Sequence, residues 1–363
     1  MTPIYRPYLH PEATKYAYDA IASGWVSSRG PYVELATELL KSTFGYKYVV
    51  LTCNGTAAGH LVAIALRACR PDVRRIIVPN NVYVAAWNTL LQEYPPEALH
   101  AIDADIRTWT ADLSGRSFDV AHEAVLAVHN VSGVFNVAAL RKRHPGLEVL
   151  EDNCEGLFGR YDGMPTGTMA FASSLSFFAN KTITSGEGGA FVTSDERAYE
   201  VAKAASDQGS THERYVHDQP GYNYRMTNVQ AALLYGQLVR RYDILDKKTS
   251  VFAMYQEMLP TDRVLLQASE DGTAPANWMM GVRVVGNSGY AAAESFMKER
   301  GVEIRPMFPP ITRHAHLRAV RTTGTAVAEI LYRECFLIPS YPDLSVAEQM
   351  TVVDAVHDYA RSL

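Results

Sequence analysis

The chain has 363 residues, 47 % hydrophobic and 20 % charged, which is typical of a globular protein with one large and one smaller domain. Lys and Arg total 34 against 39 for Asp and Glu, and no basic block occurs, so we expect no nucleic-acid partner. The N-terminus lacks the apolar core of a signal peptide, and no run of about 18 apolar residues predicts a membrane span.

Short β-branched runs alternate with longer segments of helical period, which predicts an α/β fold with a mostly parallel sheet. Strands are expected at Tyr48–Thr52, Arg75–Val78, Ala124–Val128 and Leu147–Glu151. A helix is expected at Thr56–Cys69, and strand-like pieces surround a glycine-rich turn between Thr168 and Thr193.

A single long amphipathic helix is predicted from Thr227 toward Leu259. Beyond it, a strand at Met279–Val285 and helices at Ala291–Arg300 and Val346–Arg361 indicate a compact α+β lobe. We therefore expect a large domain over residues 1–241 and a small C-terminal domain over residues 242–363.

One lysine stands between an aromatic strand and the glycine-rich turn, in the segment SFFANKTITSGEGG at Ser176–Gly189. If it is buried, loss of hydration lowers the pKa of Lys181 and makes the amine a nucleophile for a carbonyl, as in a Schiff base. Taken alone, Lys181 is more typical of a surface lysine.

An acidic residue follows an apolar strand in the run Val149–Glu155. Ligands bind α/β sheets at the carboxyl ends of the strands, and a carboxylate there can keep the ring nitrogen of a pyridoxal cofactor protonated. Asp152 is the candidate, although an isolated Asp after a strand is also a common helix N-cap.

A turn before a helix, Asn54-Gly55-Thr56, offers free backbone N–H groups for a phosphate. Gly55 permits close approach, and Thr56 adds a hydroxyl. The same residues cap helices in many proteins without binding a ligand.

These three features in this order resemble the DegT/StrS-type sugar aminotransferases of fold type I. That family carries SFxxNK followed by TxGEGG, an ED motif and an NGTxAL turn, and the likeness runs from Tyr5 to about Leu344. It implies an aspartate aminotransferase-like fold with a mostly parallel sheet, pyridoxal 5′-phosphate (PLP) as cofactor, and a homodimer with active sites shared between subunits.

The resemblance assigns roles to individual residues. Lys181 would form the Schiff base with PLP and move a proton to the sugar, and Asp152 would pair with the pyridinium nitrogen. Tyr83 would stack on the ring, and Asn223 would reach the phosphate in the neighbouring subunit. The implied cofactor-binding residues are Gly55, Thr56, Tyr83, Asp152, Glu155, Ser176, Lys181 and Asn223.

The resemblance also implies substrate-binding residues, namely Trp25, Ser28, Arg29, Gln208, Tyr215, Arg225 and Arg305. Guanidinium groups bind diphosphates and carboxylates through paired hydrogen bonds. Arg225 and Arg305 are equally compatible with structural ion pairs, and Glu155 with a solvated helix face.

Three stretches resemble the family members that form perosamine, which aminate C4 of GDP-4-keto-6-deoxymannose with L-glutamate as donor. They are Ser23–Gly30, Lys181–Gly189 and His217–Asn228. The alternatives are a dTDP- or UDP-linked 4-keto-6-deoxyhexose as acceptor, dehydration of the sugar, or a PLP-binding regulator without turnover. Dehydrating relatives carry His in place of the Schiff-base lysine, which this chain retains.

The chain departs from the family pattern after His129, where Asn130–Gly133 replaces a sequence such as IYGQ, and after Pro306, where an aromatic hydroxyl and a histidine are lost. The pair His314 and His316 lacks accompanying carboxylates or cysteines, so no metal is predicted.

The cysteine spacing indicates a reducing compartment. The four cysteines form no CxxC pair and stand far apart, at Cys53, Cys69, Cys154 and Cys335. This spacing predicts neither a zinc site nor a disulfide framework, and it favours a cytoplasmic protein.

Overall fold

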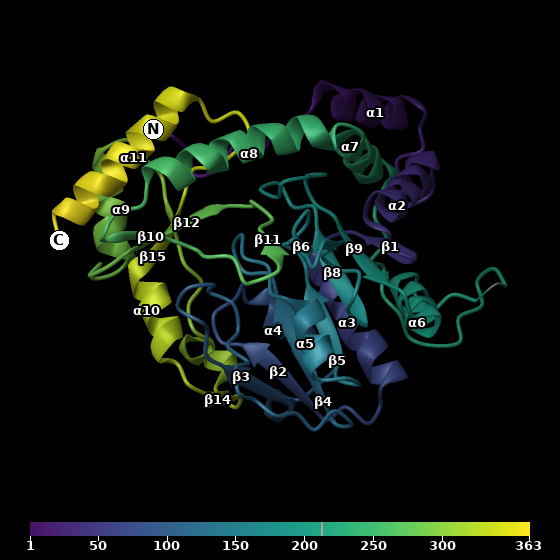
Figure 1. The fold of residues 1–363 in the computed structure, drawn as a ribbon. Coiled ribbons are helices and arrows are strands. Elements are labelled where there is room, and N and C mark those ends of the chain that lie inside the picture. The colour runs from purple at the N-terminus through teal and green to yellow at the C-terminus, as the bar shows by residue number, and fades with distance from the viewer. Residues whose placement is uncertain (212) are drawn as a thin grey trace.

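The computed structural model describes residues 1–211 and 213–363 and contains one large sheet with helices packed around it (Figure 1). Its eight strands lie in the order β1-β9-β8-β5-β4-β2-β3-β14, and only β9 runs antiparallel to its neighbours. The strands are β1 Tyr48–Thr52, β2 Arg75–Pro79, β3 Leu99–Ile102, β4 Glu123–Val128, β5 Glu148–Asp152, β8 Ala172–Ser176, β9 Gly189–Thr193 and β14 Arg321–Thr323. The predicted α/β class is confirmed, and the strands expected from sequence lie within one residue of those observed.

Helices cover both faces of this sheet because alternate residues of its central strands point to opposite sides. Ile76 and Val78 of β2 pack in the cluster that includes residues of α3, α4 and α6, whereas Ile77 packs with residues of α5. The helices of this part are α2 Pro31–Phe44, α3 Gly55–Cys69, α4 Ala85–Leu91, α5 Val137–Arg143 and α6 Glu196–Ser206, with a 3₁₀ turn η1 at Pro96–Ala98.

The single long helix expected after Thr227 is wrong, because the chain forms two helices, α7 Asn228–Val239 and α8 Arg241–Met258. Arg240 between them has φ −102° and ψ 19°, outside helical values. Leu234 of α7 and Ile244 in the first turn of α8 pack in the core beside β1 and β9, whereas Phe252, further along α8, packs in the core formed by the C-terminal part of the chain. The change of direction at Arg240 serves both cores.

We use "C-terminal lobe" for the elements from β10 to α11. Its antiparallel sheet has the order β10-β12-β15-β13, and it encloses a core that includes Val282, Phe336 and Tyr359. The elements are β10 Val264–Leu266, β12 Met280–Val284, α9 Tyr290–Glu299, β13 Arg305–Pro306, η2 Ile311–Arg313, η3 Ala315–Leu317, β14, α10 Ala326–Glu334, β15 Cys335–Ile338 and α11 Val346–Arg361. A small sheet joins β11 Thr273–Ala274 to β6 Arg160–Tyr161 and β7 Met164–Pro165.

We propose that the two domains divide at the bend between α7 and α8, near residues 241 and 242. Two segments cross this division. Thr2 pairs with Val302, so the chain start joins the C-terminal lobe, and β14 extends the large sheet beside β3. Helix α1, Pro11–Ala22, packs on α7. These crossings tie the parts together around one shared region.

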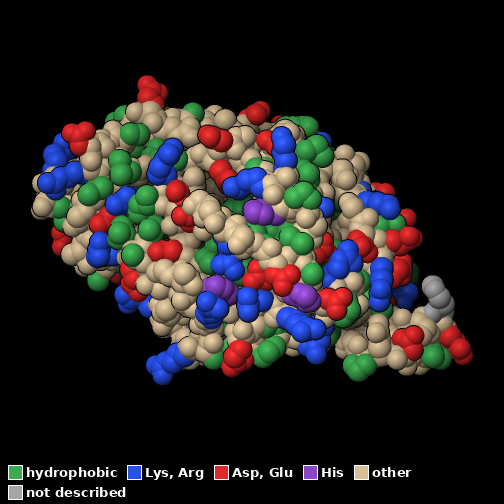
Figure 2. Space-filling model, turned by 60° about the horizontal axis from the view of Figure 1, so that its bottom comes forward, with side chains coloured by type: hydrophobic (Ala, Val, Ile, Leu, Met, Phe, Trp, Pro, Cys, Tyr) green, Lys and Arg blue, Asp and Glu red, His purple; other side chains and the backbone are tan. Residues whose placement is uncertain are grey.

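The face of the molecule shown in Figure 2 carries acidic and basic side chains close together. At the first residues of β2 and β4, the buried carboxylate of Glu123 accepts from Arg75 at 3.0 Å and lies 3.5 Å from Arg116. This pair of contacts anchors the segment before β4. Within the described residues, no helix combines the length and apolar character that crossing a bilayer requires.

Packing of α1 against α7 yields a test of the fold. A Cβ at Gly236 would lie 2.4 Å from the Cα of Ala13, so Gly236→Ala should destabilise the protein by about 1–3 kcal/mol, although Ala is the better helix former. Urea unfolding measures the change. Thr249→Ala, at an exposed position of α8, is the control, and equal stability of the two variants would contradict this packing.

Candidate active site

A cavity of about 950 Å³ opens at the carboxyl ends of β1, β2, β5 and β8, where parallel strands of α/β sheets place their ligands. Residues near β12 and β13 close its other side. Eight of the residues expected from sequence line it: Gly55, Thr56, Tyr83, Asp152, Glu155, Ser176, Lys181 and Arg305. The topology thus gathers residues that are up to 250 positions apart in the chain.

Lys181 is not a surface lysine, since its side chain is only 12 % exposed. Its Nζ lies 3.7 Å from Oε1 of Glu155 and 3.9 Å from the ring centroid of Trp278. Its backbone carbonyl accepts a hydrogen bond of 3.1 Å from the hydroxyl of Tyr5. The amine is therefore held between a carboxylate and an aromatic face, at the wall of the cavity.

Glu155 lies in a buried turn after β5 and not on a solvated helix face. Its Oε2 accepts from the backbone N–H of Val131 at 2.8 Å. Burial raises the pKa of Glu155 to about 7, although Lys181 and the Val131 N–H act in the opposite direction. Near neutral pH this carboxyl group can therefore take up or release a proton beside the lysine amine.

Val131 reaches Glu155 from the loop that departs from the family pattern. Its φ of 62° is unusual for a β-branched residue and marks a strained backbone next to the cavity. His129 fixes the start of this loop: its Nδ1 accepts from the N–H of Phe135, so the proton on Nε2 points to Glu151 at 2.6 Å. The departure in sequence therefore produces an ordered support for Glu155.

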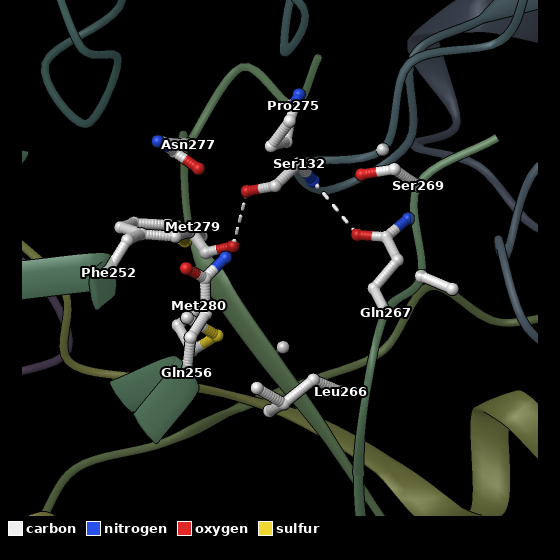
Figure 3. A pocket seen from close by; sticks show the side chains of 13 residues that line it. Ser132, Phe252, Gln256, Leu266, Gln267, Ser269, Pro275, Asn277, Met279 and Met280 are labelled. Carbon is white, nitrogen blue, oxygen red and sulfur yellow. Dashed lines mark hydrogen bonds between the residues drawn. The ribbon is translucent and has the colours of Figure 1, made fainter. Parts of the chain in front are cut away.

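A second cavity, of about 90 Å³, lies behind this loop and shares Met279 with the large cavity (Figure 3). Ser132 donates from Oγ to the carbonyl of Met279 at 2.7 Å and from its N–H to Gln267 at 3.2 Å. Gln267 in turn donates to the carbonyl of Asn130 at 2.9 Å. The loop is thus anchored to the segment just before β12 and to the segment just after β10.

Asp152 stands at the last position of β5 and faces the cavity. Its Oδ1 accepts from the N–H of Cys154 at 3.0 Å and lies 3.5 Å from the hydroxyl of Ser174. This contact closes a turn and is not a helix N-cap, because no helix forms in residues 153–159 after β5, and it uses only one carboxylate oxygen. The carboxylate can therefore also bind a cation or a protonated ring nitrogen in the cavity.

The start of α3 forms a cradle for an anion. Asn54 caps the N–H of Ala57 at 2.8 Å, while the N–H groups of Gly55 and Thr56 have no acceptor among the described residues. A Cβ at Gly55 would lie 2.7 Å from that of Ser176, so only glycine allows this close approach. A buried amine, a carboxylate and an anion cradle in one cavity fit the aldehyde, ring nitrogen and phosphate of PLP.

Seven expected residues do not line this cavity: Trp25, Ser28, Arg29, Gln208, Tyr215, Asn223 and Arg225. They lie before α2 and in the segment between α6 and α7. Arg225 pairs with Asp207 at 2.6 Å, and Arg305, inside the cavity, pairs with Glu303 at the same distance. Both arginines therefore form ion pairs, which the sequence analysis gave as the alternative to substrate binding.

Sequence reasoning missed Tyr5, Val131 and Trp278. Trp278 comes 97 positions after Lys181, in a segment with no recognisable motif, and Tyr5 belongs to the first residues of the chain. No local pattern marks such residues, because only the packing of the C-terminal lobe brings them to the lysine.

The family model described as DegT/DnrJ/EryC1/StrS aminotransferase matches residues 7–357. The chain belongs to this family. It is a PLP-dependent sugar aminotransferase, and the resemblance seen in its motifs is confirmed.

Two relatives illustrate the family. A GDP-perosamine synthase of Vibrio cholerae is 30 % identical over 370 residues and 99 % of both chains. One of Escherichia coli O157:H7 is 28 % identical over 363 residues and 98 % of both chains. Both alignments cover nearly the whole of this chain.

Solved structures share the fold at lower identity. Helicobacter pylori PseC, an aminotransferase involved in pseudoaminic acid biosynthesis, superimposes with a TM-score of 0.89 at 21 % identity, over 100 % of both chains. The GDP-4-keto-6-deoxymannose-3-dehydratase ColD gives 0.88 at 19 %, over 98 % of this chain and 100 % of that one. The fold type I prediction is confirmed. The described residues contain no cluster of three metal-ligating side chains.

The raised pKa of Glu155 predicts a pH effect on stability in the cofactor-free protein. Because the folded state favours the neutral carboxyl, this contribution is fully present below the ordinary pKa of 4.5 and is lost as pH rises through about 7. Relative to Glu155→Gln, the wild-type unfolding free energy should fall by roughly 3 kcal/mol over that range, as urea unfolding would measure.

Glu299→Gln, exposed on α9, is the control and should keep the wild-type pH profile. If Glu155→Gln keeps it as well, the carboxyl group does not hold a proton near neutral pH.

Proposed function

We propose that this aminotransferase moves an amino group from L-glutamate to C4 of a nucleotide-linked 4-keto-6-deoxy sugar. GDP-4-keto-6-deoxy-D-mannose is the preferred acceptor and GDP-perosamine the product. The buried amine of Lys181, held beside a carboxyl group that titrates near neutral pH, carries the proposal for the chemistry. The perosamine-forming relatives support the choice of acceptor.

PLP supplies an aldehyde that condenses with amines and a ring that withdraws electrons from the attached carbon. The residues of the cavity would hold it: the N-terminus of α3 with Gly55, Thr56 and Ser176 at the phosphate, and Asp152 at the ring nitrogen. Tyr83, which lines the cavity next to Phe308, presents an aromatic face for the ring.

In this proposal, Lys181 and Glu155 transfer the protons that transamination requires. The amine of Lys181 takes a proton from the carbon that loses it and returns one to the carbon that receives nitrogen. Glu155, 3.7 Å away, can store or supply a proton at Oε1 while Val131 fixes its other oxygen. Glutamate and the keto sugar would use the site in turn, with 2-oxoglutarate leaving between them.

The residues outside the cavity suggest that a second copy of the chain completes it. Asn223 is exposed, and Trp25 and Tyr215 are 59 % and 82 % exposed. We propose that in a homodimer Asn223 contacts the phosphate in the partner's site, and that Trp25, Ser28, Arg29, Gln208, Tyr215 and Arg225 bind substrate. The cytoplasm is the proposed location, since the four cysteines form no disulfide among the described residues.

Three alternatives remain: a sugar acceptor linked to another nucleotide, dehydration of the sugar, and a PLP-binding regulator without turnover. A dTDP- or UDP-linked 4-keto-6-deoxyhexose would use the same chemistry with a different nucleotide contact. Sugar dehydration is disfavoured by Lys181, because the dehydrating relatives carry His there. A regulator without turnover is disfavoured by the preserved set of Lys181, Glu155 and Asp152 around one cavity.

The assignment of Lys181 is tested by borohydride reduction of the yellow protein purified with PLP. Reduction should attach the cofactor irreversibly to Lys181, as peptide mapping by mass spectrometry would show. Lys181→Ala should lose at least about 10³-fold in transamination rate, because no other lysine among the described residues lines the cavity. Attachment to Lys248, the other lysine near Trp278, would overturn the assignment.

The acceptor is tested by supplying PLP-loaded protein and L-glutamate with GDP-4-keto-6-deoxymannose, dTDP-4-keto-6-deoxyglucose or UDP-4-keto-6-deoxyglucose in parallel. Mass spectrometry and NMR of the products identify the aminated carbon. We expect C4 amination with the GDP sugar at the highest kcat/KM. A preference for another nucleotide, or loss of the C3 hydroxyl without gain of nitrogen, would contradict the proposal.

A further inference from the structure

Lys248 is a fully buried lysine in α8, and its side chain is only 1 % exposed. Its Nζ donates to two backbone carbonyls, that of Trp278 at 2.7 Å and that of Ser340 at 2.5 Å. It forms no ion pair with a carboxylate of the described residues. Burying an ammonium group without a countercharge costs folding free energy. Stabilisation of the fold therefore does not explain why a lysine occupies position 248.

Burial lowers the pKa of Lys248 to about 7. Near neutral pH the side chain is therefore present both as an ammonium group and as an amine. Each form has at least two N–H donors, which match the two carbonyl acceptors. The contacts to Trp278 and Ser340 thus persist in either protonation state.

Trp278 is held at both ends. Its carbonyl accepts from Lys248, and its indole N–H donates to the carbonyl of Asn180 at 2.9 Å. The ring in between lies 3.9 Å from Nζ of Lys181. An aromatic face at this distance attracts an ammonium group and sets where the amine stands.

A second set of contacts links Lys248 to Lys181 through Tyr5. The ring of Tyr5 lies 6.0 Å from Nζ of Lys248, and the Tyr5 hydroxyl donates to the carbonyl of Lys181. The side chain and the backbone of Lys181 are thus both held by residues next to Lys248. Alanine or leucine at position 278 would leave the amine without its aromatic wall.

We infer that Trp278 orients the amine of Lys181 toward the cavity, and that Lys248 is a positioning residue that fixes Trp278 from α8. The inference rests on the proposed role of Lys181. According to this inference, the indole of Trp278 forms one side of the cofactor site. The amine of Lys181 reacts efficiently only while α8 and the segment before β12 hold that indole in place.

The test uses the full-length cofactor-free protein labelled with 5-fluorotryptophan, whose four tryptophans give four ¹⁹F resonances. Trp278→Phe assigns the resonance of Trp278. Lys181→Met should move this resonance, because it removes the amine from the ring face. Lys248→Met should move or broaden the same resonance and leave the other three in place.

Tyr255→Phe is the matched control. Tyr255 also lies in α8, is buried, and donates to the carbonyl of Pro339, next to Ser340, but it does not contact Trp278. It removes a comparable buried hydrogen bond, so its effect on unfolding should be similar. The Trp278 resonance should not respond to it.

A second readout is the rate at which cofactor-free protein takes up PLP, followed by absorbance. Lys248→Met should slow uptake roughly tenfold or more, because a misplaced amine reacts poorly, and Tyr255→Phe should change it less than twofold. If Lys248→Met does not fold, Trp278→Phe, which loses only the contact to Asn180 and part of the ring, should slow uptake in the same direction.

The inference is overturned if Lys248→Met leaves the Trp278 resonance in place, or if Tyr255→Phe changes resonance and uptake equally. Its failure is distinguishable from failure of the proposed function. Cofactor attachment to a lysine other than Lys181 removes the proposed function, whereas attachment to Lys181 with an unresponsive Trp278 removes only the role of Lys248.

Discussion

Burial of a lysine amine without loss of its reactivity is the constraint that the surrounding residues satisfy. An isolated ammonium group in a protein interior is unstable, so Lys181 requires partners that offset its charge. The carboxyl group of Glu155 and the aromatic face of Trp278 provide them from different directions. Because burial raises the pKa of Glu155 to about 7, the charge of this carboxyl group beside the amine depends on pH near neutrality.

Each partner depends in turn on a different part of the fold. The N–H of Val131 fixes Glu155 through a loop whose start is secured by the buried contact of His129 with Glu151. Trp278 belongs to the C-terminal lobe and is held by Lys248. The cofactor site is therefore built where the large sheet meets the C-terminal lobe, and its geometry responds to changes in either.

Two segments that differ from the family motifs, Asn130–Gly133 and the residues after Arg305, contribute to the surroundings of the cavity. The loop Asn130–Gly133 lacks the residues usual in relatives, yet it supplies the backbone donor for Glu155 and contacts the segment before β12 through Ser132. The segment after Arg305 likewise lines the cavity with apolar Met307 and Phe308.

The sequence by itself determined the fold class, four strands of the large sheet and the three motifs at Gly55, Asp152 and Lys181. Motifs of this kind are local: strand, turn and helix residues lie within a few positions, so hydrophobic period and turn chemistry reveal them. The break at Arg240 was missed because the helical period continues through it, and two separate cores impose the bend.

Only the tertiary structure decided which residues surround the amine of Lys181. Tyr5 and Trp278 come from opposite ends of the chain, and Lys248 acts through a backbone carbonyl that carries no sequence signature. Burial also changes what a residue does: loss of water raises the pKa of Glu155 to about 7 and lowers that of Lys248 to about 7. Desolvation by distant segments is a property of the folded chain, and no local pattern of residues encodes it.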